Sequence, residues 1–217
     1  MKSRTYILIA FCLFVLQSCV YVKYHNYAPT LQPEAEEIIN RLKNDTLIVV
    51  VPTYKEKERI LKSSLQSARG RVEKKKRKQK LINLYAERQV EMEAIIVAFN
   101  ELYTFSPVIY MPDSLVSNFE AGIKKTYFID DQFRLNPNIK HNNRSPIKLI
   151  KQFDQEWQIK IKNQIIPNPF PNYYLYRNGL YGFLGTERFD QMYERVASVF
   201  QKRFDMFHAN PDSRISL

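Results

Sequence analysis

The chain has 217 residues and a formal net charge of +11, and 45% of its residues are hydrophobic, enough for one domain with a sizeable core. Its two cysteines exclude a disulfide framework, and its five glycines leave little room for a phosphate-cradling loop. The charge is uneven, because residues 69–80 carry +7, the N-terminal Lys2 and Arg4 carry +2, and the rest of the chain carries only +2.

The N-terminus has the pattern of an export signal. Lys2 and Arg4 precede an uncharged apolar run at 6–16, which has the length of a signal-peptide core. The next residues, Leu16-Gln17-Ser18-Cys19, resemble the lipobox of bacterial lipoproteins. This resemblance implies that Cys19 becomes the lipidated first residue of the mature chain, and that the body lies in the bacterial cell envelope, outside the cytoplasm. Because the uncharged stretch continues to Val22, an uncleaved N-terminal membrane helix is the alternative.

The chain is therefore predicted to have three parts: a signal peptide at 1–18, a tether at 19–33 and a single α/β domain at 34–210. Cys12 would leave with the signal peptide and Cys19 would be acylated, so the folded body would contain no thiol. Zinc sites of the cysteine type and thiol redox chemistry are excluded on that basis, and we expect no cofactor.

The first half of the domain begins like a βαβ unit. A helix is predicted at 34–43, and the aliphatic run at 47–51 predicts a strand that is buried on both faces. The strand stops at Pro52. Thr53 and Glu56 then match a capping box, which predicts a helix that starts at Tyr54.

A helical pattern extends over 54–103, about 75 Å at 1.5 Å per residue, so a bend or break is expected near Gly70. Eight basic residues occupy its middle: Arg69, Arg71, Lys74, Lys75, Lys76, Arg77, Lys78 and Lys80. They have no apolar stripe among them and are predicted to project into solvent. Charge runs of this kind are commonly a solvated helix face without any partner, and this is the favoured interpretation. The alternative is contact with an anionic lipid or an envelope protein, and nucleic acid is not expected, given the location.

The middle of the domain predicts more sheet. Strands are expected at 108–111 and 126–129, separated by a short helix at 115–121 that Gly122 ends. Three buried strands separated by helices indicate a parallel or mixed sheet.

The last third predicts a short helix at 148–155, a strand at 157–162 and a hairpin over 173–184 around Asn178-Gly179. A final helix starts near Thr186. Its apolar stripe comprises Phe189, Tyr193, Val196, Phe200, Phe204 and Phe207. The whole pattern predicts an α/β fold: a mixed, partly parallel sheet with helices on its faces, one long bent helix, and a C-terminal β-hairpin plus helix.

Polar residues that follow the predicted strands are the candidates for chemistry. They are Thr53, Asp113 and Asp130, and the carboxyl ends of parallel strands meet at one edge, where α/β folds bind ligands. Such a cluster could bind a divalent metal through oxygen, or its members could simply cap helices and form turns. The three histidines show no metal-ligand spacing, so no metal site is assigned.

Two functions follow from these observations. The first is a membrane-anchored envelope lipoprotein with a binding or structural role, held to the membrane through Cys19, whose ligand the sequence does not identify. The alternative is a membrane-tethered α/β enzyme, metal-assisted or hydrolytic, with its site at the strand carboxyl ends. The lack of a catalytic motif favours the first.

Overall fold

The computed structural model describes residues 33–123, 125–141, 145–151, 156–161, 164–165, 173–174 and 189–209. The signal peptide, Cys19, the tether up to residue 32 and the predicted hairpin turn at Asn178-Gly179 lie outside these residues.

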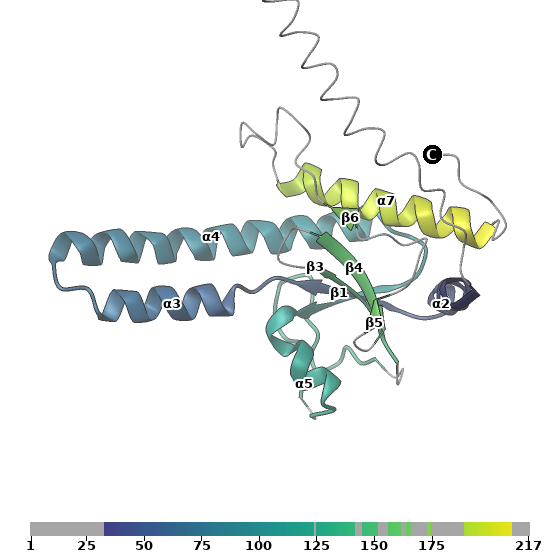
Figure 1. Cartoon of the computed structure of the whole chain (residues 1–217), viewed down its shortest axis with the longest axis horizontal. Helices are drawn as coiled ribbons and strands as arrows, with labels where there is room; N and C mark the ends of the chain where they lie inside the picture. The colour runs from purple at the N-terminus through teal and green to yellow at the C-terminus, as the bar shows by residue number, and fades with distance from the viewer. Residues whose placement is uncertain are drawn as a thin grey trace, which may run out of the picture.

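The described strands form one mixed sheet with the order β2-β1-β3-β4-β5 (Figure 1). The strands are β1 (Leu47–Val51), β2 (Val108–Pro112), β3 (Ile147–Lys151), β4 (Glu156–Ile161), β5 (Gln164–Ile165) and β6 (Tyr173–Tyr174), which pairs with β4. β1 is parallel to both β2 and β3, whereas β3 and β4 are antiparallel. The predicted α/β class with a mixed, partly parallel sheet is confirmed.

The described helices are α2 (Pro33–Lys43), α3 (Lys55–Gln66), α4 (Arg71–Leu102), α5 (Val116–Glu120), which follows the 3-10 turn η1 (Asp113–Leu115), and α7 (Phe189–Ala209). They cover both faces of the sheet. In β1, Leu47, Val49 and Val51 pack against α2, α4 and α7, and Ile48 and Val50 pack on the opposite face, where α5 lies. Every side chain of β1 is therefore buried, as the unbroken aliphatic run predicted.

Aromatic rings fill the larger core between the sheet, α4 and α7. Phe99 and Trp157 lie 6.4 Å apart by ring centroids, and Trp157 and Tyr193 lie 5.9 Å apart. The apolar stripe predicted for the last helix is buried from Tyr193 to Phe207, and only Phe189 at its start is 37% exposed. The final helix thus covers one face of the sheet and buries its own aromatic stripe there.

The predicted break near Gly70 is confirmed, and the chain reverses there. α3 ends at Gln66, and α4 starts at Arg71 and returns alongside it, so the two form a hairpin that projects beyond the sheet (Figure 1). Gly70 has an extended backbone with φ −118, so the reversal does not depend on left-handed glycine geometry. The Arg77 guanidinium instead satisfies the end of α3, donating to the Ser64 carbonyl and, at 3.3 Å, to the Ser67 hydroxyl.

Two predictions, one for the start of α3 and one for residues 126–129, differ from the structure. The capping box is wrong: α3 is preceded by Tyr54 with left-handed backbone (φ 53) and no side-chain cap, because the Thr53 hydroxyl donates to Asp113 instead. The strand predicted at 126–129 is reduced to isolated bridges that Ile129 makes with Tyr110 and Leu135.

The third parallel strand is β3, where a helix was predicted. Its residues alternate between the two faces: Leu149 joins the larger core, whereas Lys148 points to the opposite side and is fully buried. Lys148 forms an ion pair with Glu120 of α5. A buried lysine is rare unless it is paired, so the strand depends on a partner 28 residues away that local periodicity does not reveal.

Candidate functional site at the carboxyl edge of the sheet

Two of the three predicted site residues meet at the carboxyl edge. The register aligns Val51 of β1 with Pro112 of β2, so the residues that follow them come together. The Thr53 backbone N–H donates to Asp113 Oδ1 at 3.0 Å, and the Thr53 hydroxyl donates to the same oxygen. The Asp113 carboxylate therefore holds the loop that follows β1.

Asp130 serves its own turn. Its Oδ1 accepts the backbone N–H groups of Gln132 at 3.0 Å and Arg134 at 2.9 Å, and its Oδ2 lies 3.6 Å from Arg134 Nε. This is the turn-forming role that the sequence offered as the alternative. Among the described residues, no group of three or more His, Cys, Asp or Glu side chains is placed to hold a metal ion.

A cavity of about 870 Å³ opens where the parallel strands end, and we call it the edge cavity. It lies between the ends of β1, β2 and β3 and the first two turns of α3, with Pro52, Asp113 and Lys151 at the three strand ends. β1 has β2 on one side and β3 on the other, so the chain crosses over at this point. Open α/β sheets bind ligands at such a crossover.

The wall of the edge cavity has both apolar and basic parts. Ile60 and Leu61 contribute apolar surface from α3, and Lys55, Lys57 and Lys151 contribute basic groups. A neighbouring cavity of about 590 Å³ shares Lys55 and Ser114 with it and extends toward α4. The two cavities together make the carboxyl edge a hollowed part of the molecule.

A buried carboxylate lies behind this wall. Glu91 of α4 is 1% exposed, and its Oε1 accepts hydrogen bonds from Lys151 Nζ at 2.5 Å and from the Tyr193 hydroxyl. Its Oε2 accepts a hydrogen bond from the Tyr54 hydroxyl. Lys151 Nζ also donates to the Tyr193 oxygen at 3.0 Å. We call these four residues, Glu91, Lys151, Tyr54 and Tyr193, the Glu91 network.

The electrostatics of the network keep both tyrosines protonated. Burial and the Glu91 carboxylate together raise the pKa of Tyr54 and of Tyr193 far above the usual value for a phenol, burial being the larger cause in each case. Each hydroxyl therefore remains a donor to Glu91 at any physiological pH. Two of the four residues, Tyr54 and Lys151, also line the edge cavity, so the buried network fixes part of its wall.

Tyr54 adopts its position at a cost. Its backbone lies in the left-handed region (φ 53, ψ 29), which costs a non-glycine residue on the order of 1 kcal/mol or more. The hydrogen bond to Glu91 and the cation–π contact with Lys57, whose Nζ lies 5.6 Å from the ring centroid, hold the side chain there.

The sequence placed Tyr193 on the apolar stripe of the last helix but connected none of the four network residues with a site, although it carried one signal. Glu91 lies on the apolar stripe of α4, seven residues after the buried Leu84 and four before the buried Ile95. An acid on the buried stripe of a helix indicates a paired polar group. Lys151 carried no comparable signal, because its segment was predicted as helix.

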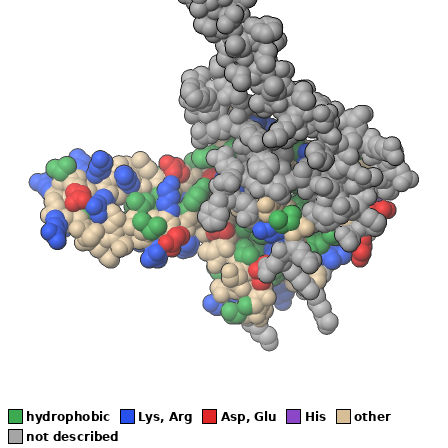
Figure 2. Space-filling model, in the orientation of Figure 1, with side chains coloured by type: hydrophobic (Ala, Val, Ile, Leu, Met, Phe, Trp, Pro, Cys, Tyr) green, Lys and Arg blue, Asp and Glu red, His purple; other side chains and the backbone are tan. Residues whose placement is uncertain are grey.

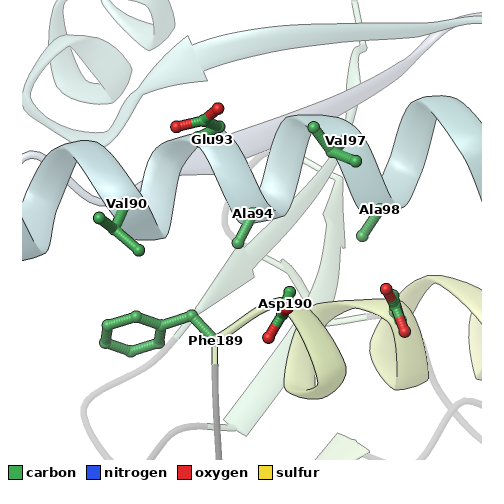
Figure 3. A pocket seen from close by; sticks show the side chains of 8 residues that line it. Val90, Glu93, Ala94, Val97, Ala98, Phe189 and Asp190 are labelled. Carbon is green, nitrogen blue, oxygen red and sulfur yellow. The ribbon is translucent and has the colours of Figure 1, made fainter.

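A second groove, of about 460 Å³, lies between α4 and α7 (Figure 3). Ala94 and Ala98 point toward α7, and Phe189 lies beside Asp190 on the facing side (Figure 3). Glu194 adds a second acid from α7. This groove contains none of the predicted site residues and none of the Glu91 network, so it is the weaker candidate for a ligand site.

The eight basic residues at 69–80 lie at the far end of the α3–α4 hairpin, where basic side chains gather on the surface (Figure 2). All are exposed except Arg77, which is half-buried against α3. No helix in the described part of the chain combines the length and the apolar character that a membrane span needs. The chain matches no protein-family model, no curated protein and no solved structure.

Proposed function

We propose that this protein is a membrane-anchored lipoprotein of the bacterial cell envelope whose α/β body binds a small amphipathic anion in the edge cavity. The observation that carries the binding role is the position of that cavity, at the crossover of three parallel strands, with a wall that the Glu91 network fixes in place. A preformed cavity with an apolar lining and a few convergent polar groups is typical of ligand sites.

The chemistry of the lining supports an anionic group on the ligand. Both acids in the wall already have partners, since Thr53 binds Asp113 and Arg59 donates to Glu56 at 2.8 Å. The wall also carries three lysines, and among the described residues Lys55 forms no ion pair. Ile60 and Leu61 supply the apolar surface that an attached hydrocarbon or ring would cover.

The binding role can be tested with 1-anilinonaphthalene-8-sulfonate, an amphipathic anion that fluoresces on burial. We expect one saturable site in the purified protein, and an affinity about tenfold lower for Lys55→Ala, because an ionic hydrogen bond is lost. The matched control is Lys125→Ala, which removes an exposed lysine outside the cavity and should change nothing. Equal binding by the wild type and Lys55→Ala would contradict the proposal.

The anchor rests on the resemblance of residues 16–19 to a lipobox. In cells, we expect Cys19→Ala to prevent acylation and signal removal, and mass spectrometry of the wild type to find a lipidated N-terminal Cys19. Cys12→Ala is the matched control, since Cys12 lies in the segment to be removed. A wild-type protein that retains residues 1–18 would instead show the uncleaved membrane helix.

The alternative, a tethered enzyme, is supported by the same wall, because Tyr54 and Lys151 place an O–H and an ammonium beside the cavity. Metal-assisted chemistry has less support, since Asp113 binds Thr53 and Asp130 holds its own turn. Turnover of any ester, phosphate or glycoside by the purified protein, lost in Tyr54→Phe and retained in Tyr127→Phe, would establish the enzyme over the binding protein.

A further inference from the structure

We infer that the tip of the α3–α4 hairpin, residues 67–80, binds the anionic headgroups of a phospholipid bilayer. It would act as a second membrane contact, in addition to the N-terminal anchor. The setting rests on the proposed envelope location, but the contact itself depends only on the tip.

The charges at the tip are almost entirely uncompensated. Residues 69–80 contain eight basic side chains and one acid, Glu73. Arg77 forms an ion pair with Glu73 and also binds the end of α3. Of the eight basic side chains, all of them within the described structure, no other forms an ion pair. Seven cations therefore remain available to a partner.

Four of these cations share one side of α4. Arg71, Lys74, Lys75 and Lys78 follow the spacing i, i+3, i+4, i+7, which places them on one face of a helix. Arg77 points elsewhere, toward α3. Val72, in the first turn of α4, is 84% exposed, so an apolar side chain accompanies the cations at the outermost part of the hairpin.

The hairpin projects away from the sheet, which places its tip where it can contact a surface other than the α/β body. Between Arg59 and Asn83 only Ala68 is buried, so this part contributes almost nothing to a core. α4 has 32 residues and is about 48 Å long at 1.5 Å per residue, which carries the tip well beyond the sheet. α2, the first described element after the tether, lies at the opposite end of the sheet from the projecting hairpin (Figure 1).

A lipid surface fits this tip better than a protein does. Five of the eight cations are lysines, which act as mobile point charges and do not form the fixed forks that recognise a single carboxylate. Val72 is the only strongly exposed apolar residue at the tip, so the tip offers little apolar surface for a protein to cover. Charges of this kind suit a plane of headgroups, to which each cation adds about fivefold in affinity.

A second copy of this chain is the competing occupant. The groove between α4 and α7 carries the acids Glu93, Asp190 and Glu194 around its apolar floor, and a basic tip could dock there. Such a contact would be head-to-tail and would depend on protein concentration and not on lipid. The experiment therefore separates the two.

The test places an environment-sensitive fluorophore on Val72→Cys, in full-length protein that also carries Cys12→Ser, and the same protein without Val72→Cys is labelled in parallel to measure any label on Cys19. The protein is mixed with vesicles of phosphatidylcholine alone, or of equal parts phosphatidylcholine and phosphatidylglycerol. We expect a blue shift only with the anionic vesicles and steep loss of that shift with added salt. Changing Lys74, Lys75 and Lys78 together to Gln should weaken the contact by about 100-fold.

The matched control removes the same charge elsewhere, by changing the exposed Lys125, Lys140 and Lys202 to Gln, and should keep the shift. An equal shift with neutral vesicles, no shift with anionic ones, or equal loss in both triple variants would overturn the inference. A shift that rises with protein concentration in detergent alone would assign the tip to a second copy. The fraction of protein that floats with neutral vesicles reports the anchor separately, so failure of the anchor and failure of the tip are distinguishable.

Discussion

The two halves of helix α4 have opposite surroundings. From Leu84 onward the helix buries Glu91, Ile95, Ile96 and Phe99 against the sheet and α7. Its first part, from Arg71 to Asn83, contains no buried side chain and lies beside α3 (Figure 1). A single regular helix can thus be a core element at one end and an exposed projection at the other, because the periodicity of its apolar residues starts only partway along.

The two halves also use charge differently. In the described part of the body, two charged side chains are fully buried and each has a partner: Glu91 pairs with Lys151, and Lys148 pairs with Glu120. At the tip of the hairpin, the cations are exposed and mostly unpaired. Buried pairs hold elements in register and cost stability when broken, whereas exposed like charges contribute little to stability and attract counter-charges. Stability and recognition are therefore expected to lie in different halves of α4.

The largest expected difference in unfolding free energy is between a substitution in the apolar core and one in the exposed part of α4. Phe99→Ala removes a fully buried ring and should lower the free energy of unfolding by about 3–5 kcal/mol. Ile82→Ala, on the exposed half, should change it by less than about 0.5 kcal/mol, because Ile82 is 48% exposed. Urea denaturation of both variants measures the contrast, and similar losses would show that the hairpin is as tightly integrated as the core.

Removal of the buried Glu91 carboxylate should give the next largest loss of unfolding free energy. Glu91→Ala removes the carboxylate that accepts from Lys151 and two tyrosine hydroxyls, leaves the Lys151 ammonium without its counter-charge, and should cost about 3 kcal/mol of unfolding free energy. Glu93→Ala, two residues further along and exposed, is the matched control and should be close to neutral. Combining Glu91→Leu with Lys151→Met should recover most of the loss, whereas an unchanged deficit would argue that the hydrogen bonds of the tyrosines dominate.

The smallest effect is a pH dependence at the base of the hairpin. Glu58 of α3 accepts hydrogen bonds from Lys62 Nζ at 2.6 Å and from the Tyr85 hydroxyl of α4 at 3.1 Å. The Lys62 ammonium, its main partner, holds the pKa of Glu58 below the usual value. Because the pKa is lowered on folding, the stabilisation is complete above the unfolded value of about 4.3 and is lost as the pH falls through the folded value.

Hydrogen exchange of the α3 amides, corrected for intrinsic rates, tests this dependence. Protection of α3 should decrease between about pH 5 and pH 3 while protection of the α7 amides changes less. Glu58→Gln should remove the difference between the two pH values, because the side chain no longer titrates. If the loss at low pH persisted in Glu58→Gln, another carboxylate would be responsible.

The candidate site shows how far the sequence could lead. Thr53 and Asp113 were predicted to converge because parallel strands end at a shared edge, and the register of β1 and β2 brings them into contact. Asp130 follows a segment that makes only isolated bridges, and its carboxylate serves a turn. The closeness of Thr53 and Asp113 thus followed from the strand topology. What each carboxylate binds depended on which backbone N–H groups lie near it, and the sequence does not show this.

The sequence by itself determined β1, α2, the break near Gly70 and the apolar stripe of α7, since each depends on a local pattern of apolar and turn residues. Only the tertiary structure decided that Lys148 and Glu91 are buried, because partners far along the chain compensate their charges. The same holds for the start of α3, where the Thr53 hydroxyl binds Asp113 in place of the expected helix cap and Tyr54, with its left-handed backbone, reaches Glu91. Local periodicity predicts which apolar side chains are buried. Whether a charged side chain can be buried depends on its partner, which lies far along the chain.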